Sequence, residues 1–330
     1  MATALQNGST PSSTQETSSI IRVEGIRHSY GERAALKGVS FGVQPGEIFG
    51  LLGPNGSGKT TLFRILSTLM LPGDGRAIIA GFDVAKQPDE VRRRIGVVFQ
   101  ARSSDIKLTA TENLWHQGHL YGLRGAVLQA RIREMLERVG LADRAKDRVE
   151  TFSGGMQRRV ELVKGLMHRP SVLLLDEPTT GLDPGARLDL WLYLDELCRQ
   201  ENVAIIVTTH LMEEAERCDR LAILNSGEIV GLGTPAELRS QIGGDVIMLE
   251  TADPALLADR IHQRFRIAAS VLDGKVRMEI RDGLRFVTNL AETFPGAIQS
   301  VSISKPTLDD VFIGRTGHRF WTETTKEEKD

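Results

Sequence analysis

The stretch LLGPNGSGKTTL, residues 51–62, decides the fold because it matches the phosphate-binding loop pattern GxxxxGK[ST] from Gly53 to Thr60. The residues before it, EIFGLLG, predict a buried strand. Four apolar residues after it recur at the spacing of one helical face, namely Leu62, Ile65, Leu66 and Leu69. A loop between a strand and a helix predicts nucleotide binding, and the alternative is a glycine-rich turn that matches by accident.

The loop has the chemistry that phosphate binding requires. Glycines let consecutive N–H groups turn toward one centre, and the N-terminus of the helix adds partial positive charge. We expect Lys59 to neutralise the β and γ phosphates of a nucleotide and the Thr60 hydroxyl to bind Mg²⁺. The nucleotide-binding residues predicted here are Gly53, Pro54, Asn55, Gly56, Ser57, Gly58, Lys59, Thr60 and Thr61.

Composition excludes several classes of protein. The 41 Lys and Arg residues nearly balance the 43 Asp and Glu residues, which argues against nucleic acid as the main partner. Cys198 and Cys218 lack the spacing of a zinc site or a disulfide framework, so we expect a reducing cytoplasm. No run of 18 apolar residues occurs, and the polar N-terminus does not resemble a secretory signal. We therefore expect no membrane span.

The pattern along the 330 residues predicts two domains between loose ends. We expect a disordered tail over 1–19 and an α/β domain with a mixed, mainly parallel sheet over 20–243, where short apolar runs alternate with helical patterns. A helical subdomain is predicted over about 101–165, where one apolar helical stripe consists of Leu128, Ile132, Met135, Leu136 and Val139. Residues 244–316 read as β, α, β, β, α, β, which predicts a small α+β domain of ferredoxin-like order. Residues 317–330 are charged and predicted to be loose.

A second motif, which is acidic, supplies the carboxylates that a phosphate loop requires. VLLLDE places Asp176 and Glu177 directly after four apolar residues, at the end of a predicted buried strand. One carboxylate would lie beside Mg²⁺ and the other within reach of a water aligned on the γ phosphate. Glu177 is thus the candidate general base and Asp176 a metal ligand. The alternative is a strand that ends in two solvated acids.

The segment FSGGMQRR, residues 152–159, resembles the signature motif of ATP-binding cassette (ABC) ATPases, a family of phosphate-loop NTPases. The resemblance covers residues 20–235, and its parts occur in the order of the family. They are Tyr30, the loop at 53–60, Gln100 ending GVVFQ, the signature, LLLDEP, GLDP and His210 ending IVTTH. Phe152 departs from the family, in which leucine is usual, and we expect altered packing there.

The resemblance implies roles for three further side chains. Tyr30 would stack on adenine, although an ordinary half-exposed tyrosine is the alternative. Gln100 would bind Mg²⁺ or its water and report the nucleotide state to the helical region. His210 would contact the γ phosphate and hold the water beside Glu177, whereas a lone histidine in this position is more often structural.

The signature implies a shared site. In this family it serves the nucleotide bound by a second copy, so two copies would face each other head to tail. Each copy would offer Ser153, Gly154, Gly155 and Gln157 to the ATP of the other copy. Asp183 of GLDP would lie at the interface between the two copies. The alternative is that Ser153 is only a helix cap.

The expected function is therefore that of a cytoplasmic ATPase subunit that binds MgATP and powers separate membrane permeases from the cytoplasmic face of the membrane. The segment SISKPTLDDVFIGRTG, residues 302–317, resembles the tail of ATPases from drug-resistance, sodium-export and nodulation-factor exporters. The alternatives are a non-transport ABC ATPase of translation or DNA repair and a regulatory subunit with little turnover. The former usually carries two cassettes or long heptad insertions, which this chain lacks.

Overall fold

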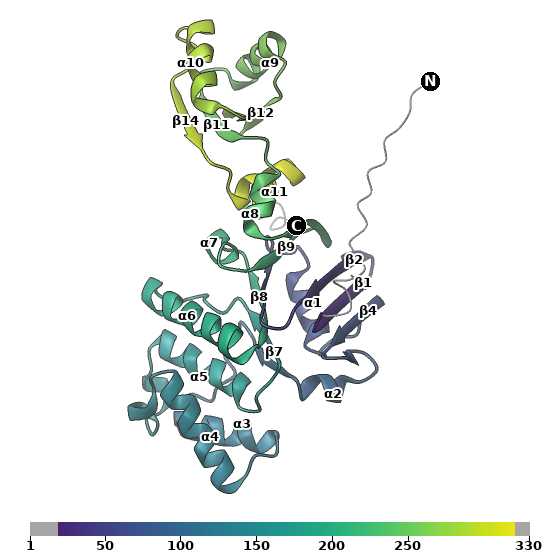
Figure 1. Ribbon diagram of the computed structural model, residues 1–330, viewed down its shortest axis with the longest axis vertical. Coiled ribbons are helices and arrows are strands. Elements are labelled where there is room, and N and C mark those ends of the chain that lie inside the picture. The colour runs from purple at the N-terminus through teal and green to yellow at the C-terminus, as the bar shows by residue number, and fades with distance from the viewer. Residues whose placement is uncertain (1–18, 321–330) are drawn as a thin grey trace. The chain divides into compact units, whose positions relative to one another are not determined.

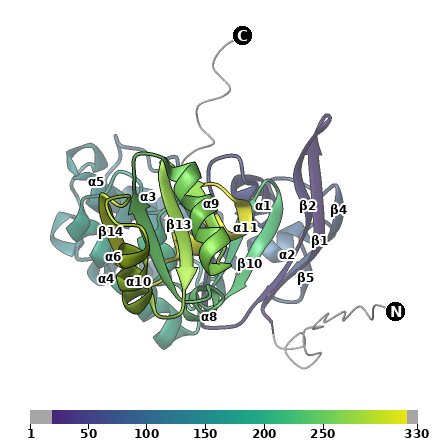
Figure 2. The ribbon, with the colours of Figure 1, turned by 90° about the horizontal axis from the view of Figure 1, so that it is seen from above.

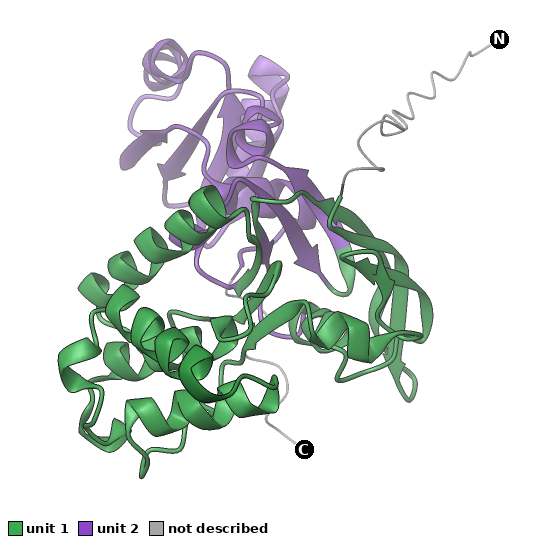
Figure 3. Ribbon diagram, turned by 60° about the horizontal axis from the view of Figure 1, so that its bottom comes forward, with its two compact units in different colours: residues 1–49, 58–208, 226–228 green, residues 50–57, 209–225, 229–330 purple. Residues whose placement is uncertain are grey.

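The computed structural model describes residues 19–320, which divide into two compact units (Figures 1 and 3). Unit 1 comprises the chain up to Phe49, Gly58–Thr208 and Ser226–Glu228. Unit 2 comprises Gly50–Ser57, Thr209–Asn225 and the chain from Ile229 onward. The domain boundary at 243/244 stays a prediction. Between residues 19 and 320, no helix combines the length and apolarity needed to cross a bilayer.

An antiparallel sheet of order β2-β1-β4-β5 belongs to unit 1. Its strands are β1 (Ile21–Tyr30), β2 (Arg33–Val43), β4 (Asp74–Ile79) and β5 (Phe82–Asp83). The sequence predicted β1 and the β4 region but not β2. In β2, glycines and charged residues interrupt the apolar alternation, and the pairing with β1 contains register shifts. The strand is thus held mainly by its partner and not by a strong local pattern.

A six-stranded sheet of order β10-β9-β3-β8-β7-β6 carries the strand that precedes the phosphate loop. Its strands are β3 (Ile48–Leu52), β6 (Ile95–Val98), β7 (Val172–Asp176), β8 (Ala204–Thr209), β9 (Arg220–Asn225) and β10 (Glu228–Gly233). β6, β7 and β8 pair in parallel, and every residue of β7 and β8 is buried. Continuous apolar runs are typical of parallel strands covered on both faces. The predicted mixed, mainly parallel sheet is confirmed.

Helices account for the stretch of unit 1 between β6 and β7, as predicted. The helices of unit 1 are α1 (Lys59–Leu66), α2 (Pro88–Arg92), α3 (Ala110–Leu120), α4 (Gly125–Arg138), α5 (Gly154–Leu166) and α6 (Pro184–Glu201), with short 3₁₀ turns at Ala142–Arg144 and Val149–Thr151. The predicted apolar stripe of α4 is buried at Leu128, Ile132, Met135 and Leu136. The prediction was wrong for Leu69, because α1 ends at Leu66 and Leu69 is 63% exposed.

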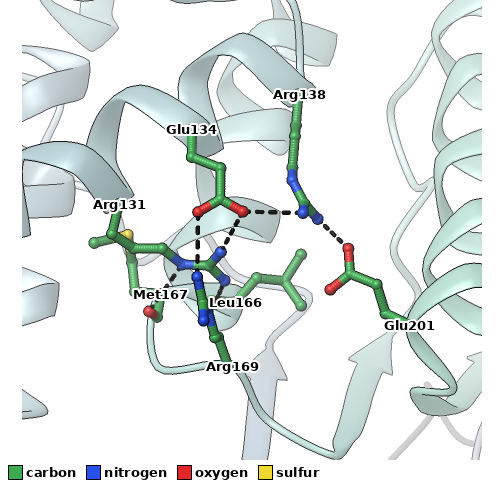
Figure 4. A network of polar contacts seen from close by, with 7 residues as sticks. All are labelled: Arg131, Glu134, Arg138, Leu166, Met167, Arg169 and Glu201. Atoms are coloured by element: carbon green, nitrogen blue, oxygen red, sulfur yellow. Dashed lines mark hydrogen bonds and ion pairs between the residues drawn. The ribbon is translucent and has the colours of Figure 1, made fainter. Parts of the chain in front are cut away.

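A polar network fastens α4 to the ends of α5 and α6 (Figure 4). Arg131 is buried and donates hydrogen bonds to the carbonyls of Leu166 (2.6 Å) and Met167 (3.2 Å). Those carbonyls close α5, where the last C=O groups of a helix lack partners within it. Glu134 bridges Arg131 and Arg138, and Arg138 also pairs with Glu201 at the end of α6. The helical segment is therefore tied to its neighbours by buried polar contacts as well as by apolar packing.

Unit 2 contains a four-stranded antiparallel sheet of order β12-β13-β11-β14. Its elements are β11 (Asp245–Glu250), α9 (Pro254–Phe265), β12 (Ala269–Leu272), β13 (Lys275–Ile280), α10 (Gly283–Thr293) and β14 (Ser300–Ser304). Figure 2 shows α9 and α10 lying along this sheet. Ile247, Leu249, Val276 and Met278 form a core with these helices. The strand order and the two helices give the ferredoxin-like arrangement.

A separate apolar cluster in unit 2 joins β9 to α7 (Met212–Ala215), α8 (Pro235–Ser240) and α11 (Leu308–Thr316). Phe320 is 2% exposed and packs against Phe312, with ring centroids 5.0 Å apart. The start of the predicted loose tail at 317–330 is therefore packed, because the aromatic ring of Phe320 completes this cluster. Residues 321–330, and residues 1–18 of the predicted N-terminal tail, lie outside the described residues.

A half-buried histidine, His168, contacts two other segments of unit 1. The rings of His168 and Tyr121 stack in parallel, with centroids 3.7 Å apart. His168 Nε2 lies 2.9 Å from the Ile95 carbonyl, which fixes the proton on this nitrogen. Its Nδ1 is buried and has no hydrogen-bond partner in the described part of the chain. Burial lowers the pKa of His168 to about 4, so the folded protein holds the ring neutral.

We predict that His168 makes the protein less stable as the pH falls. Between about pH 6.5 and pH 4 the unfolded chain binds a proton at this histidine and the folded chain does not, so unfolding becomes more favourable. In His168→Gln the free energy of unfolding should fall less steeply over this range, by roughly 2 kcal/mol in total. Urea denaturation at several pH values measures this. The exposed His116→Gln is the control, and equal slopes for His168→Gln and the wild type would contradict the prediction.

Candidate functional site

The phosphate loop connects β3 to α1, and its glycines are fixed by steric limits. Gly58 precedes α1 with φ 106°, in the region that favours glycine. A Cβ there would lie 2.6 Å from the Ala35 carbonyl oxygen. A Cβ on Gly53 would lie 2.4 Å from Ser57 Oγ, so the loop also closes tightly on itself. The local chain thus brings backbone amides close together at the start of a helix.

The loop has two features that suit an anion. The first N–H groups of α1 point away from the helix body, since the first intrahelical bond runs from Leu62 N to the Gly58 carbonyl. Ser57 Oγ is buried and lacks a hydrogen-bond partner among residues 19–320. A buried hydroxyl without a partner is costly unless a ligand satisfies it. Phosphate oxygens would do so.

Lys59 opens α1 as a buried cation and is 5% exposed. Burial lowers its pKa, while the charges of Glu177 and Asp176 raise it and so favour the ammonium form. Asp176 ends β7, and burial raises its pKa despite a hydrogen bond from Thr208 Oγ1 at 2.6 Å. The sequence placed Lys59 in one motif and the two acids in another, and the structure brings them together in unit 1.

Glu177 has a strained backbone, and hydrogen bonds hold its side chain in place. Its φ is 43°, an uncommon value for a residue with a side chain. Thr208 holds the backbone, since Glu177 N donates to both its carbonyl and its hydroxyl. The side-chain oxygen Oε2 accepts hydrogen bonds from Gln100 Nε2 (3.2 Å) and Thr180 Oγ1 (3.3 Å). Gln100 is therefore in direct contact with the acidic motif, a contact that the sequence did not predict.

His210 follows β8 in unit 2, beside the start of the phosphate loop. Gly53 N donates to the carbonyl of Thr209, the residue before His210, at 3.3 Å. The turn that carries His210 is fixed by Thr209, whose hydroxyl donates to Glu214 (2.6 Å) and accepts from Leu211 N (2.9 Å). The histidine thus stands on a defined turn at the end of a buried strand.

Tyr30 ends β1 with 47% of its surface exposed. Its hydroxyl lies 3.5 Å from Thr61 Oγ1 in the first turn of α1 and 3.5 Å from Met70 Sδ. The ring also makes an edge contact with His28. These contacts place an exposed aromatic ring near the residues of unit 1 that follow the loop.

The signature and GLDP segments lie together in unit 1. Ser153 caps α5 by accepting from Met156 N, and Asp183 caps α6 by accepting from Ala186 N at 3.0 Å. A Cβ on Gly155 would meet the Ala186 Cβ at 2.8 Å, so only glycine allows the two helix starts to approach this closely. Ser153 does form the helix cap that the sequence left as an alternative. A cap does not exclude a second contact to a ligand.

Gln157 lies inward from the signature turn. It is buried, and its amide nitrogen donates to the carbonyls of Val149 and Phe152, both at 3.1 Å. Its amide oxygen accepts from Arg102. In this conformation the Gln157 side chain links Arg102 to the carbonyls of Val149 and Phe152. Its predicted direct contact to nucleotide stays a prediction.

Sequence reasoning missed Arg158, which links the signature helix to the acidic motif. Its guanidinium donates to the carbonyls of Pro178 (2.7 Å), Phe99 (2.7 Å) and Asp176 (3.3 Å). Burial lowers its pKa. The signal was its place on the apolar stripe of α5, four residues before the buried Leu162. An arginine on a core-facing stripe predicts a structural tie between segments.

The predicted metal ligands are the Thr60 hydroxyl, Gln100 and Asp176, which all offer oxygen atoms. Oxygen donors suit Mg²⁺, which usually keeps several waters and binds substrate phosphates as well. Within the described chain, no three His, Cys, Asp or Glu residues form a metal cluster. The donor set therefore fits an ion that the nucleotide helps to hold.

Comparison with known proteins adds to this geometry. Residues 36–180 match the family model "ABC transporter", and residues 233–316 match "ATP-binding protein DrrA1-3-like, C-terminal domain". The daunorubicin resistance ATP-binding protein DrrA2 of Streptomyces coeruleorubidus is 38% identical over 93% of this chain and 97% of its own length. The linearmycin resistance ATP-binding protein LnrL of Bacillus subtilis strain 168 is 37% identical over 90% of this chain and 98% of its own length.

Two further similarities concern export and assembly. The Nod factor export ATP-binding protein I of Paraburkholderia xenovorans is 38% identical over 90% of this chain and 97% of its own length. A dimeric post-hydrolysis structure of the ATP-binding cassette MJ0796 with ADP and Pi is 29% identical, with a TM-score of 0.59 over 65% of this chain and 98% of that one. These findings favour transport over translation or DNA repair. With the phosphate loop, the acidic motif and the signature on one chain, this protein belongs to the ABC transporter ATP-binding proteins, a family of ATPases.

Proposed function

We propose that this protein is the ATPase subunit of an exporter and acts on membrane permease subunits from the cytoplasmic face of the membrane. The observation that carries the proposal is the buried Lys59 ammonium beside Asp176 and Glu177, after a glycine-rich loop. Drug-resistance and Nod factor export relatives support the direction of transport. The roles below rest on the chemistry of the residues and on their contacts.

ATP binding is assigned to the loop, Lys59 and Tyr30. The backbone amides of 53–61 and the Ser57 hydroxyl would hold the β and γ phosphates, and Lys59 would neutralise them. Since Lys59 is a buried cation, phosphate oxygens would add anionic ligands to it and would help to offset its desolvation. The exposed ring of Tyr30 would stack on adenine, with its hydroxyl held near Thr61.

Hydrolysis is assigned to Glu177. Thr60, Gln100 and Asp176 would hold Mg²⁺, which would neutralise charge that develops on the phosphates. Glu177 would accept the proton of the attacking water through its carboxylate, which Gln100 and Thr180 orient. His210 would hold the γ phosphate and this water. Because Gln100 contacts the base directly, a change at the start of the helical segment would alter the geometry of hydrolysis.

A head-to-tail pair of copies completes the proposed site. Ser153, Gly154 and Gly155 of one copy would contact the γ phosphate held by the other, and Asp183 would line the seam. The dimeric arrangement of the similar cassette MJ0796 supports this pairing. The close approach at Gly155 and Ala186 means that the signature turn and the start of α6 would meet the second copy as one surface.

The permease contact is assigned to the helical segment. A cavity of about 410 Å³ in unit 1 is lined by residues of α3, α4 and the turn after α4, including Thr111, Trp115, Ile132, Leu136 and Ala142. Trp115 is 44% exposed there. We assign this cavity to the end of a permease helix. The reason is that α3 follows the segment beginning at Gln100, which contacts Glu177, so a contact here would be coupled to the nucleotide site.

Lys59→Ala should weaken ATP binding by about 100-fold or more, since the phosphates lose a buried cation. Titration with a fluorescent ATP analogue measures the affinity. The exposed Lys86→Ala is the control and should bind normally. Unchanged affinity in Lys59→Ala would remove the phosphate-binding assignment.

Glu177→Gln should retain ATP binding and lower turnover by about 100-fold or more, the scale of a lost general base. The amide has the same shape but does not accept the proton. Phosphate release measures turnover, and Glu196→Gln on the exposed side of α6 is the matched control. Normal turnover in Glu177→Gln would assign the base to another residue.

The transport function is tested by purifying the tagged protein from detergent-solubilised membranes of its own host. We expect a polytopic membrane protein, identified by mass spectrometry, to copurify. Trp115→Glu should lose this partner and keep ATP affinity, while Leu284→Glu, an exposed leucine of unit 2, should retain it. Copurification of ribosomal RNA or DNA in place of a membrane protein would contradict the proposal.

A further inference from the structure

The chain directly after Gln100 is fastened to the signature helix α5. Ser103 donates to the Glu161 carboxylate through its backbone N (3.0 Å) and its hydroxyl (2.6 Å), and Ser104 N donates to the same carboxylate. Lys164 on the same helix donates to the Ser103 carbonyl at 2.9 Å. These bonds satisfy Glu161, which is buried, and they lower its pKa against the effect of burial. The path of residues 101–104 is therefore set by α5.

Arg102 lies within this fastened stretch and reaches the first turn of α5. Its guanidinium donates to the amide oxygen of Gln157, and its Nη2 lies 3.5 Å from the position that a Cβ on Gly154 would take. Gln157 is itself fixed by the carbonyls of Val149 and Phe152. The guanidinium thus lies against the Ser153–Gly155 turn, and the side chain remains exposed to solvent.

Across residues 19–320, Arg102 pairs with a neutral amide and with no carboxylate. It adds a full positive charge to the positive end of a helix, and the buried Arg158 lies close enough for the charge of Arg102 to act on it. The carboxylates of Glu161 and Asp176 offset the charge of Arg158, whereas the exposed guanidinium of Arg102 contacts only the neutral Gln157 amide among the residues that the structure describes and has donors left for an anion from outside the chain.

We propose that Arg102 is a phosphate-binding residue whose guanidinium contacts the γ phosphate of the ATP that the second copy holds through its own Lys59. The inference rests on the shared site of the proposed function. Arg102 would add a charge-assisted hydrogen bond beside the Ser153 hydroxyl and the glycine amides, and Gln157 would orient it. ADP lacks the γ phosphate, so the contact would favour pairing with ATP over pairing with ADP.

The first test measures ATP-driven dimer formation in the Glu177→Gln background, where hydrolysis does not disperse the complex. Light scattering gives the ATP concentration at half-maximal dimer. Arg102→Ala should raise this concentration about tenfold or more, and Arg102→Lys should recover part of the loss. The exposed Arg124→Ala, which removes the same charge elsewhere in the helical segment, should match the background. ATP-analogue binding to the monomers checks that each variant is folded and should be unchanged.

Ser153→Ala separates this inference from the proposed function. If Ser153→Ala weakens dimer formation and Arg102→Ala does not, the shared site stands and the inference about Arg102 is wrong. If neither variant changes dimer formation, both are wrong. If Arg102→Ala and Arg124→Ala raise the ATP concentration equally, the effect is one of net charge and Arg102 has no specific role.

Mixed dimers test whether Arg102 acts across the interface. A copy with Lys59→Ala pairs with an Arg102→Ala copy to give one site with an intact lysine facing an intact Arg102, and ATP should drive this pairing. A copy with both substitutions, paired with an otherwise unchanged copy, leaves its one ATP facing the altered residue 102 and should pair about tenfold less readily. The reverse ranking would mean that Arg102 acts on the nucleotide of its own copy, which overturns the inference.

Discussion

The site depends on one electrostatic arrangement, a desolvated ammonium whose charge is favoured by two nearby carboxylates. Lys59 is buried at the start of α1, while Asp176 ends β7 and Glu177 follows it directly. Burial alone would push the lysine toward its neutral form, and the two acids oppose this. The glycines of the loop permit the arrangement, because a side chain at Gly58 would collide with the Ala35 carbonyl.

Two buried arginines, Arg158 and Arg131, connect the signature helix α5 to the segments around it. Arg158 joins three carbonyls from separate segments, so the signature helix, the residue before Gln100 and the end of β7 hold one another in place. Arg131 plays a comparable part at the far end of α5 (Figure 4). Both are buried cations whose hydrogen bonds go mainly to backbone carbonyls, so polar contacts add to the apolar packing of the helical segment.

The sequence predicted the parts of the fold that depend on local pattern. The loop, the apolar runs of β7 and β8 and the stripe of α4 were found because their periodicity and composition suffice. β2 and the end of α1 at Leu66 were not found, since pairing and local capping decide them. Within the site, motif order indicated Lys59, Asp176 and Glu177 together, but the inward turn of Gln157 and the ties made by Arg158 and Arg102 depend on contacts between distant segments. Such contacts leave no local pattern in one sequence.

The left-handed backbone at Glu177 has a consequence for how this protein is built. A residue with a Cβ in that conformation costs of order 1 kcal/mol or more, and glycine would occupy it at less cost. A glycine at position 177 would relieve this strain and would also remove the carboxylate that we propose as the base.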